Sequence, residues 1–580
     1  MGSYLNQFRV VLVMLFLTNT SFSLFAQSSQ SGERSSVVYQ SPVRIPVSLS
    51  GNYGELRSGR HHAGIDFRAY GKVGDPIYAV ADGYIARVTV GSSGYGNGIY
   101  LSHPDGTQTV YGHLHRFIPA VRDRVEQAQY AEKSFSVDLE FTPEEFPVTA
   151  GTIIGYIGNS GSSGAPHLHF EIRTPDQSGT LNPLRAGVVS IKDTKAPRID
   201  RIAFVGCFED AAGVVHTRDV ASFQYGTSNV LSLPPTSYII VEAVDVQDGT
   251  PAKLGVESYR LWLDDELIFD YQLGEYLFRE NKSFNALIDY AAKQRGKGNG
   301  VKTWVEPGNE YRLRRPSMGA DGRIHLQDDA VHRLRLELMD EHGNVVERTF
   351  RIRRNDEKYA EQAQAILADT TKGTWTSWVL PRYVTRPGLE LGFFPGSFFR
   401  DVHVAVEELP QEAGVFSSVW SVGDPSVALK RSARLRMRVD APDSLKSKLL
   451  LARKNKKGKW IAAGGRVSGD TLRAALSSFG VYAVVADLEA PTLKARFKDG
   501  ADLRRTGVCA WTIQDALSGI ASWEVRIDDQ WVIGQFDAKF NKLWVEMDPK
   551  VVARGKKHWV EVTVRDSRNN VSTQSWQFIW

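Results

Sequence analysis

The stretch that decides the fold of this chain runs from residue 60 to residue 173. It begins with Arg60-His-His-Ala-Gly-Ile-Asp66, continues through Tyr111-Gly-His-Leu-His115 and closes with Pro166-His-Leu-His-Phe-Glu171. Seven of the thirteen histidines of the 580-residue chain lie between positions 61 and 169. Because neutral imidazole is the commonest metal ligand in proteins, this clustering indicates a metal site.

The spacing within the stretch indicates which side chains share that site. His167 and His169 stand two apart in an apolar, aromatic run that is typical of a strand, and such residues point to one face. His62 and Asp66 stand four apart, with a glycine between them that favours a loop or strand end over a helix. Catalytic zinc takes three protein ligands and keeps a fourth position for water. With His113, the set offers three ligands and two groups for proton transfer or charge stabilisation.

At these residues the sequence resembles the lysostaphin/LytM-type zinc endopeptidases of peptidoglycan. The resemblance covers about residues 48–184. A single His-x-His pattern is weak, but the segments together are specific and follow the order of that family. They are Gly51-Asn-Tyr-Gly-Glu-Leu-Arg57, His62-Ala-Gly-Ile-Asp66, Gly74-Asp-Pro-Ile-Tyr-Ala79, Asp82-Gly83, Tyr95-Gly-Asn-Gly98, Tyr111-Gly-His-Leu114, Gly155-Tyr-Ile-Gly-Asn-Ser-Gly161 and His167-Leu-His-Phe-Glu171.

The resemblance implies a role for each of five residues. His62, Asp66 and His169 would bind Zn²⁺, and His113 and His167 would form a non-ligand pair that polarises the water and stabilises the oxyanion. The chain departs from the family pattern in an extra segment near residues 118–147. The resemblance therefore does not predict which residues form the wall of the substrate groove.

Other polar residues of the stretch have simpler interpretations. His61 adjoins a ligand and is expected to point elsewhere, and His115 is expected to pack or to face solvent. His103 is expected to belong to a turn beside a hairpin. Glu171 lies two residues past His169 and is expected to orient that ligand from behind rather than to act as a general base.

Length and composition limit the number of domains and the class of protein. A chain of 580 residues is expected to hold about four domains, and its 42% hydrophobic and 11% aromatic content is typical of globular folding. The formal net charge of +4 is too small to indicate a nucleic-acid partner. Cys207 and Cys509 are the two cysteines, which excludes a cysteine-based zinc site. They lie in different predicted domains, so a disulfide between them is not favoured.

The N-terminus is typical of an exported protein. Arg9 precedes an apolar run at residues 10–17, which predicts a signal peptide at 1–26 with cleavage near Ala26. Residues 27–40 are rich in Ser, Gln and Gly and are expected to form a disordered linker. No other run approaches the length of a membrane span. We therefore expect a soluble, exported protein of the periplasm or cell envelope.

The fold class is predicted to be all-β. Residues 41–190, the predicted zinc endopeptidase domain, alternate short strand-like runs with Asp-Gly and glycine-rich turns. The resemblance implies a lysostaphin-type β-sheet for this domain. The predicted strands are Ile77–Val80, Tyr84–Val90, Ile99–Ser102, Thr107–His113, Ile153–Ile157 and His167–Arg173.

The residues beyond 190 contain an internal repeat. Asp193-Thr-Lys-Ala-Pro197 recurs as Asp487-Leu-Glu-Ala-Pro491, and residues 255–265 and 334–344 recur as 519–529 and 560–570. Each copy predicts an immunoglobulin-like β-sandwich, at 193–355 with an insertion near 285–322 and at 487–580. Residues 356–371 have the composition of a helical linker. Residues 372–486 are predicted to form a third β-sandwich.

Together these patterns predict an exported zinc metalloendopeptidase that hydrolyses peptide cross-links of peptidoglycan. Residues 193–580 are expected to supply localisation or control and no chemistry, because the six remaining histidines are scattered over separate β-regions. A fragment of residues 41–190 is then expected to fold and bind zinc alone. An envelope protein is a possible partner of the sandwiches. Two alternatives stay open, a non-catalytic wall-binding activator of another hydrolase and a structural or adhesive β-sandwich protein.

Overall fold

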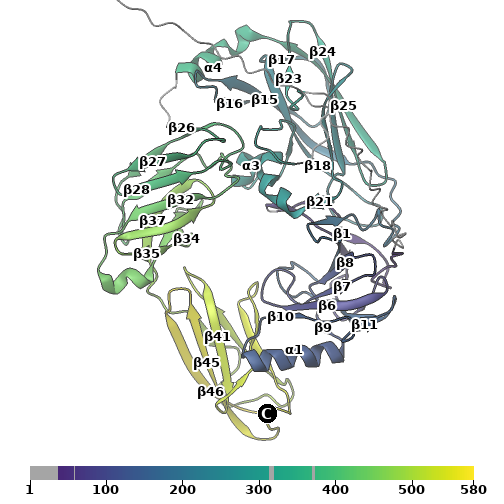
Figure 1. Cartoon of the computed structure of the whole chain (residues 1–580), viewed down its shortest axis with the longest axis vertical. Helices are drawn as coiled ribbons and strands as arrows, with labels where there is room; N and C mark the ends of the chain where they lie inside the picture. Colours follow the sequence, from purple (N-terminus) through teal and green to yellow (C-terminus); the bar gives the residue numbers. More distant parts are fainter. Residues whose placement is uncertain (1–36, 58, 312–318, 369–372) are drawn as a thin grey trace, which may run out of the picture. The chain divides into compact units, whose positions relative to one another are not determined.

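The computed structural model describes residues 37–57, 59–311, 319–368 and 373–580. The predicted signal peptide at 1–26 and most of the predicted linker at 27–40 lie outside the described residues. Strands dominate the part of the chain that is described (Figure 1), so the predicted all-β class is confirmed. In that same part, no helix is long and apolar enough to span a bilayer.

A large antiparallel sheet forms the framework of the N-terminal β-region. Its strands lie in the order β1 (Leu49–Gly51), β4 (Ile65–Arg68), β13 (His167–Arg173), β8 (Gln108–Gly112), β7 (Gly98–Ser102), β6 (Gly83–Val90) and β10 (Val137–Glu140). A smaller sheet contains β5 (Pro76–Tyr78), β12 (Ile153–Tyr156) and β9 (Arg116–Phe117). The ribbon β2 (Leu56–Arg57) and β3 (Arg60–His61) precedes β4, and β11 (Pro147–Val148) pairs with β6. The six strands predicted for this region agree with the structure to within two residues at each end.

Strand β13 shows why the sheet forms and where the polar face lies. Leu168, Phe170 and Ile172 are fully buried in the core, which is the apolar half of a period-two pattern. Each such side chain contributes roughly 1.5–3 kcal/mol on burial. His167 and His169 occupy the alternate positions and therefore point to the opposite face, as the spacing predicted.

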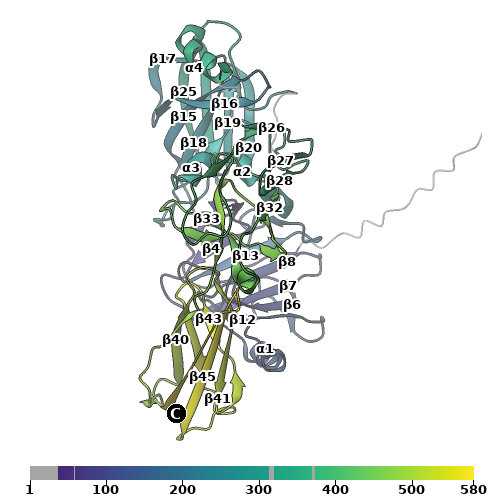
Figure 2. The ribbon, with the colours of Figure 1, turned by 90° about the vertical axis from the view of Figure 1, so that its left-hand side faces the viewer.

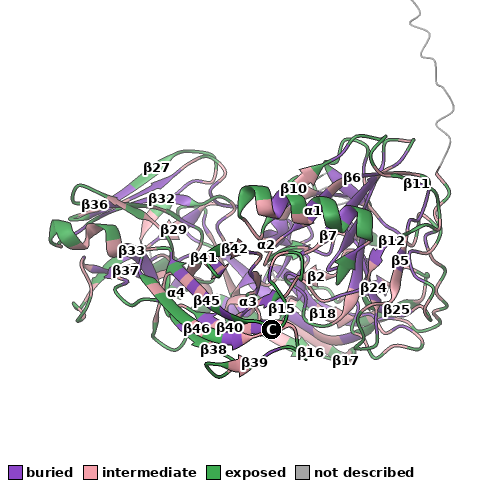
Figure 3. Cartoon of the chain, turned by 90° about the horizontal axis from the view of Figure 1, so that it is seen from below, coloured by how far each residue is buried: buried purple, intermediate pink, exposed green. Residues whose placement is uncertain are grey.

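The extra segment near residues 118–147 folds into a helix and an edge strand. Helix α1 (Pro119–Glu132) begins with proline, whose fixed φ suits a first helical turn. Its residues Val121, Val125 and Ala128 are buried on one side, while the rest of the helix is largely exposed (Figure 3). Strand β10 then pairs with β6, at the far edge of the sheet from β13.

The sheet does not end at residue 190. Strand β14 (Gly179–Leu181) pairs with β13 on one side and with β21 (Tyr276–Leu277) on the other. One hydrophobic core runs continuously from Val43 to Ile352. The peptidase-like region and the region after it are therefore joined by a shared sheet and a shared core.

Two further sheets build the region 193–355. One contains β16 (Val215–Phe223), β15 (Arg198–Glu209), β18 (Thr236–Val244), β22 (Val301–Lys302) and β23 (Ile324–His325). The other has the order β17 (Thr227–Leu233), β25 (Val345–Arg354), β24 (His332–Met339), β19 (Ser258–Leu263) and β20 (Glu266–Gln272). The short helices η1 (Phe278–Ser283), α2 (Phe284–Leu287) and α3 (Tyr290–Gln294) lie just before and within the start of the predicted insertion. Helix α4 (Asp356–Ala368) follows, where a linker helix was predicted.

Residues 373–486 form two five-stranded sheets around a separate core. The first contains β27 (Arg382–Arg386), β28 (Leu389–Phe393), β32 (Ala433–Arg438), β36 (Thr471–Leu476) and β35 (Arg466–Ser468). The second contains β30 (Val406–Leu409), β31 (Val419–Val422), β37 (Gly480–Ala486), β33 (Leu449–Lys454) and β34 (Trp460–Ala462). The pair β26 (Thr374–Thr376) and β29 (Val402–Val404) and helix η2 (Asp443–Lys448) complete this region.

One sheet of the C-terminal region has the same strand order as one sheet of the region 193–355. The larger sheet of the C-terminal region has the order β39 (Ala501–Asp502), β46 (Val571–Ile579), β45 (Lys557–Asp566), β41 (Ile520–Ile527) and β42 (Gln530–Val532), with β45 and β41 side by side (Figure 2). Strands β39 and β46 run parallel, as β17 and β25 do in the first copy. The other sheet holds β38 (Thr492–Ala495), β40 (Val508–Gln514), β44 (Lys542–Glu546) and β43 (Gln535–Asp537). Cys207 and Cys509 are both buried and unpaired.

Candidate metal centre and active site

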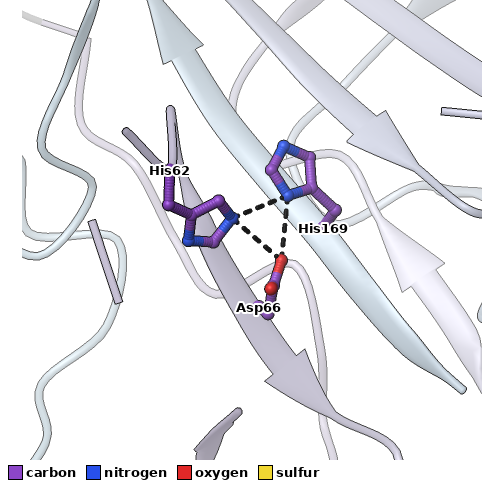
Figure 4. A group of neighbouring side chains, drawn as sticks. All are labelled: His62, Asp66 and His169. Carbon is purple, nitrogen blue, oxygen red and sulfur yellow. Dashed lines mark hydrogen bonds and ion pairs between the residues drawn. The ribbon is translucent and has the colours of Figure 1, made fainter. Parts of the chain in front are cut away.

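Three predicted ligands meet at the ends of β4 and β13. Asp66 Oδ1 lies 2.8 Å from His169 Nδ1 and 3.1 Å from His62 Nε2, and the two nitrogens are 3.0 Å apart (Figure 4). Asp66 and His169 are direct partners across the two strands, and all three side chains are at most 6% exposed. A Cβ at Gly64 would lie 2.0 Å from the Phe170 carbonyl oxygen, so glycine is needed for this close approach.

The donor set and its spacing fit a zinc ion. Tetrahedral zinc with bonds of about 2.0–2.1 Å holds its ligand atoms about 3.3 Å apart. The observed separations of 2.8–3.1 Å are a few tenths of an ångström shorter, so small outward movements would accommodate the ion. Two imidazoles and one carboxylate are also the N and O donors that zinc accepts in catalytic sites. The assignment of these residues as ligands stays a prediction.

In both candidate histidine ligands one ring nitrogen is hydrogen-bonded to a group outside the site. That hydrogen bond decides which of the two nitrogens faces the site. His62 Nδ1 donates to the Asn52 carbonyl oxygen at 2.8 Å, which leaves Nε2 with its lone pair toward the site. His169 Nε2 donates to Glu171 Oε1 at 2.8 Å, which leaves Nδ1 toward the site. Glu171 thus orients a ligand from behind, as the sequence predicted.

The predicted catalytic pair, His113 and His167, has the same arrangement. His113 Nδ1 donates to the Ser160 carbonyl oxygen and His167 Nδ1 to the Ala165 carbonyl oxygen, both at 2.8 Å. The ring centroids lie 4.8 Å apart, and His167 Nε2 is 3.4 Å from Asp66 Oδ1. Each ring therefore directs its Nε2 toward the candidate ligands.

Backbone conformation and a glycine loop hold His113 in place. His113 has φ +65°, an uncommon value for a residue with a side chain and one that is found at functional sites. Its acceptor, Ser160, lies in the loop between β12 and β13. Gly161 has φ +65° and would place a Cβ 2.3 Å from the Gly96 nitrogen, so glycine lets this loop press against residues 94–97.

Burial and neighbouring charges shift the pKa values of the site residues in different directions. Burial lowers the pKa of His62 to about 4 and that of His113 to about 3, so both rings are neutral near pH 7. Burial also acts to lower the pKa of His169, but its hydrogen bonds to Asp66 and Glu171 outweigh this and raise the pKa to about 9. Burial acts to raise the pKa of Asp66, and the surrounding histidines outweigh it and hold that pKa well below its usual range.

The remaining histidines of the stretch lie away from the three ligand atoms. His61 is fully buried, donates its Nδ1–H to the Gly54 carbonyl oxygen at 2.9 Å and is surrounded by aromatic rings of the following region. Those rings belong to Tyr271, Tyr276, Phe284 and Tyr311. His115 is exposed, and His103 is bonded to the Asp82 carbonyl oxygen and Thr109 beside its turn. The predictions that these three are not ligands agree with their positions.

A cavity of about 280 Å³ opens at the site, and part of its wall comes from the next region. Tyr276, Phe278 and Asn281, from β21 and η1, line it together with residues of the glycine-rich motifs. None of residues 118–147, all of which the structure describes, lines this cavity. Residues after 193 therefore line the site, because strand β21, which precedes the predicted insertion, extends the main sheet. That these residues supply no chemistry stays a prediction.

Two residues of the sequence motifs contact the site, although the sequence analysis assigned them no role there. Arg57 contacts the second carboxylate oxygen of Asp66. The Tyr95 ring lies 5.4 Å from that of His169, and its hydroxyl donates to Glu171. Both residues lie in segments that carried the resemblance, so the sequence could have indicated that they belong to the site. Tyr276 and Phe278 have no such signal.

Two histidines of the tail converge as well. His216 Nε2 and His403 Nε2 lie 2.7 and 2.9 Å from the same oxygen, Asp210 Oδ2. The two histidines lie in separate β-regions, as the sequence indicated, but they meet at one carboxylate. Sequence separation of the two residues concealed their proximity.

Comparisons with known proteins agree with the geometry. Residues 60–136 match the model of Peptidase family M23, and residues 373–487 match the model of a Zu5-like domain. The chain therefore contains an M23 peptidase domain, similar in sequence to the lysostaphin group. The matched residues include His62, Asp66 and His113 and end before β13.

Curated relatives match a limited part of the chain. Over 149 residues the chain is 32% identical to the DD-carboxypeptidase/endopeptidase Mpg of Neisseria meningitidis serogroup B, which covers 26% of this chain and 27% of Mpg. Over 118 residues it is 36% identical to the glycyl-glycine endopeptidase ALE-1 of Staphylococcus capitis, covering 20% and 26%. The chain thus spans about a quarter of the length of these relatives. The solved catalytic domain of the M23 protein EnpA from Enterococcus faecalis covers 25% of this chain and 95% of that chain at 26% identity, with a TM-score of 0.19.

Proposed function

We propose that the protein is an exported, zinc-dependent endopeptidase that hydrolyses peptide cross-links of bacterial peptidoglycan. The observation that carries this proposal is the convergence of His62, Asp66 and His169 with the pair His113 and His167. Of these five residues, His62, His113 and His169 line one cavity. The M23 match supports the peptidase class. The names of the relatives, an endopeptidase Mpg and a glycyl-glycine endopeptidase, support peptide bonds of the wall as substrate.

His62, Asp66 and His169 would hold the zinc, which when bound supplies a Lewis acid that acidifies a water and polarises a carbonyl. His113 and His167 would act on the same water and carbonyl. Since Nδ1 of each ring already donates to a backbone carbonyl, Nε2 must first accept a proton. The protonated ring can then donate that proton to the oxyanion or to the leaving amine.

The test is digestion of purified sacculi by the zinc-loaded mature chain, with the new termini identified by mass spectrometry. We expect new amino and carboxyl termini at the cross-links. His113→Ala and His167→Ala should keep their zinc and lose on the order of a hundred- to a thousand-fold in turnover. His169→Ala should lose the metal.

Two outcomes would contradict the proposal in different ways. A zinc-loaded chain that binds sacculi without releasing peptides would favour a wall-binding activator. A His169→Ala variant with a full complement of zinc would refute the ligand assignment. Export through the signal peptide is tested by fractionating cells that express the whole chain, and a role of the sandwiches in binding an envelope protein stays a prediction.

A further inference from the structure

One sheet of the region 373–486 has a strongly basic outer surface that the peptidase mechanism does not use. Its strands β27, β28, β32, β36 and β35 contain seven arginines and a single acidic residue, Glu390. Along β32 buried and exposed residues alternate, and Arg434, Arg436 and Arg438 hold the exposed positions. The apolar residues between them belong to the core of the region. The period of a strand therefore gathers these arginines on the outer side of the sheet.

Three arginines form a row across neighbouring strands. Arg473 of β36 is the direct partner of Arg436 on β32 and of Arg466 on β35. All three residues are exposed. Direct cross-strand partners have Cβ atoms about 4.5–5.5 Å apart, and like charges in such pairs destabilise a sheet. This row is unfavourable for the stability of the sheet, which indicates that it serves a purpose other than folding.

The basic face, as we call Arg434, Arg436, Arg466 and Arg473, is only partly neutralised by the protein itself. Arg436 forms an ion pair with Glu390 at 3.3 Å, at one end of the row. Among the residues that the structure describes, no carboxylate forms an ion pair with any of the other three arginines. Each guanidinium group keeps its charge and offers its N–H donors in a planar fork. The basic face therefore presents uncompensated charge and free donors to an anion.

The basic face is also hollowed and contacts an aromatic ring. An open hollow of about 550 Å³ lies on it, lined by alanines of β32 and β36 and by Phe394, Arg431, Arg434, Arg436 and Arg473. The guanidinium carbons of Arg431 and Arg434 lie 5.7 and 5.1 Å from the centroid of the Phe394 ring. Cation–π contacts of this kind attract an arginine to the ring and limit its freedom. The hollow can thus receive a strand of polymer between guanidinium groups, two of which are held by the ring.

We propose that the basic face binds the carboxylates of peptidoglycan peptides and so holds the enzyme on the wall. A guanidinium group and a carboxylate form two parallel N–H···O bonds, so a carboxylate is well matched to an unpaired arginine fork. Peptides of the wall end in carboxylates that recur along the polymer, and a row of arginines can bind several of them. A hollowed face also suits a polymer strand better than the flat surface of a bilayer. The inference rests on the proposed function, because that function makes the wall the partner.

The experiment measures co-sedimentation of the zinc-loaded mature chain with purified sacculi, on ice so that little digestion occurs. Arg473→Glu should weaken this binding about ten- to a hundredfold, because it removes a hydrogen-bonded contact to a charged group. Binding of the wild type should fall as the salt concentration rises from about 0.05 to about 0.5 M, since exposed charges are screened. Sacculi whose carboxylates have been amidated should bind the wild type as weakly as untreated sacculi bind Arg473→Glu.

The variant is expected to fold, because its new carboxylate lies between Arg436 and Arg466. Two like-charged cross-strand pairs become oppositely charged pairs, so its Tm should equal or exceed that of the wild type. The matched control is Arg351→Glu, which makes the same change in net charge at an exposed arginine of β25. This control should bind sacculi as the wild type does.

A small soluble cross-linked peptide separates this inference from the proposed function. Because Arg473 lies outside the peptidase region, Arg473→Glu and the wild type should cleave that peptide at the same rate. Absence of cleavage by both would refute the proposed function alone, while loss of sacculus binding in Arg473→Glu would still support the basic face as a wall-binding surface.

Three outcomes would overturn the inference. The first is equal binding of sacculi by the wild type, Arg473→Glu and Arg351→Glu. The second is undiminished binding of the wild type to amidated sacculi. The third is binding to vesicles of anionic phospholipid that Arg473→Glu abolishes while its binding to sacculi persists, which would assign the basic face to a membrane.

Discussion

Removing the region after residue 190 should destabilise the peptidase domain, although the sequence predicted a self-sufficient fragment. Asn52 exchanges two hydrogen bonds with the backbone of Gly255, at 2.8 and 2.7 Å. The Tyr53 hydroxyl accepts from the Tyr276 nitrogen at 3.0 Å. The ring of His61 packs among four aromatic side chains of the same region. A fragment that ends at residue 190 loses all of these contacts.

The size of the effect follows from those contacts. Three hydrogen bonds at about 1 kcal/mol each give about 3 kcal/mol, and exposing the surface around His61 adds roughly 1 kcal/mol. A loss of about 4 kcal/mol is a large part of the 5–15 kcal/mol by which domains are stable. At about 2–4 °C per kcal/mol for a domain of this size, Tm should fall by about 8–16 °C.

Zinc affinity should fall too, because the Asn52 carbonyl oxygen is the acceptor that orients His62. Loss of such an orienting contact typically costs 10–100-fold in metal affinity. The contacts of Asn52, Tyr53 and His61 with the region after residue 190 are called the seam here. The assay compares residues 37–190 with residues 37–368, which retain the seam and helix α4, by calorimetric unfolding and by competition with a zinc chelator. If the two fragments unfolded within about 2 °C of each other and bound zinc equally, the seam would contribute no stability and the reasoning would be wrong.

Three further predictions concern the site. Glu171→Gln keeps the shape of the side chain but weakens the acceptor for His169, so zinc affinity measured by chelator competition should fall about 10–100-fold. An unchanged affinity would show that Glu171 does not orient His169 for metal binding. Because the pKa of His169 is raised to about 9, the zinc-free protein holds a proton there at pH 7. Zinc uptake should then release about one proton, and affinity should rise about tenfold per pH unit until pH exceeds that pKa; calorimetry in buffers of different ionisation enthalpy counts the proton, and no release would contradict the assignment. Phe278→Ala should raise KM for a soluble cross-linked peptide with zinc content and kcat little changed, since this ring lines the cavity; loss of zinc would show a different role.

The sequence could predict what depends on near neighbours in the chain. The alternation along residues 167–173 follows from the period of a strand, and it correctly placed His167 and His169 on one face. Turn residues fixed the strand ends of the peptidase region to within two positions. The internal repeat likewise predicted a duplicated topology, because both copies keep the apolar pattern of the same strands.

Contacts between distant segments were not predictable in this way. Nothing in the sequence of residues 276–281 indicates that they lie at the site, and the pairing of β21 with β14 is what brings them to the cavity. The extra segment at 118–147 left the groove wall undetermined at the level of sequence, and its strand β10 pairs at the opposite edge of the sheet. Likewise, His216 and His403 are far apart in sequence, and only the fold places both against Asp210.

The four histidines of the site share one hydrogen-bonding arrangement, and this arrangement explains how distant contacts affect the site. Each ring fixes its free nitrogen by donating the other N–H to a group outside the metal centre, namely Asn52 O, Ser160 O, Ala165 O or Glu171 Oε1. The site geometry is therefore set before a metal binds, by segments that are themselves held elsewhere. Asn52 is held by Gly255, so one of the four tethers depends on the region after residue 190. A change at that seam can reach the candidate zinc ligand His62 through a single intervening residue.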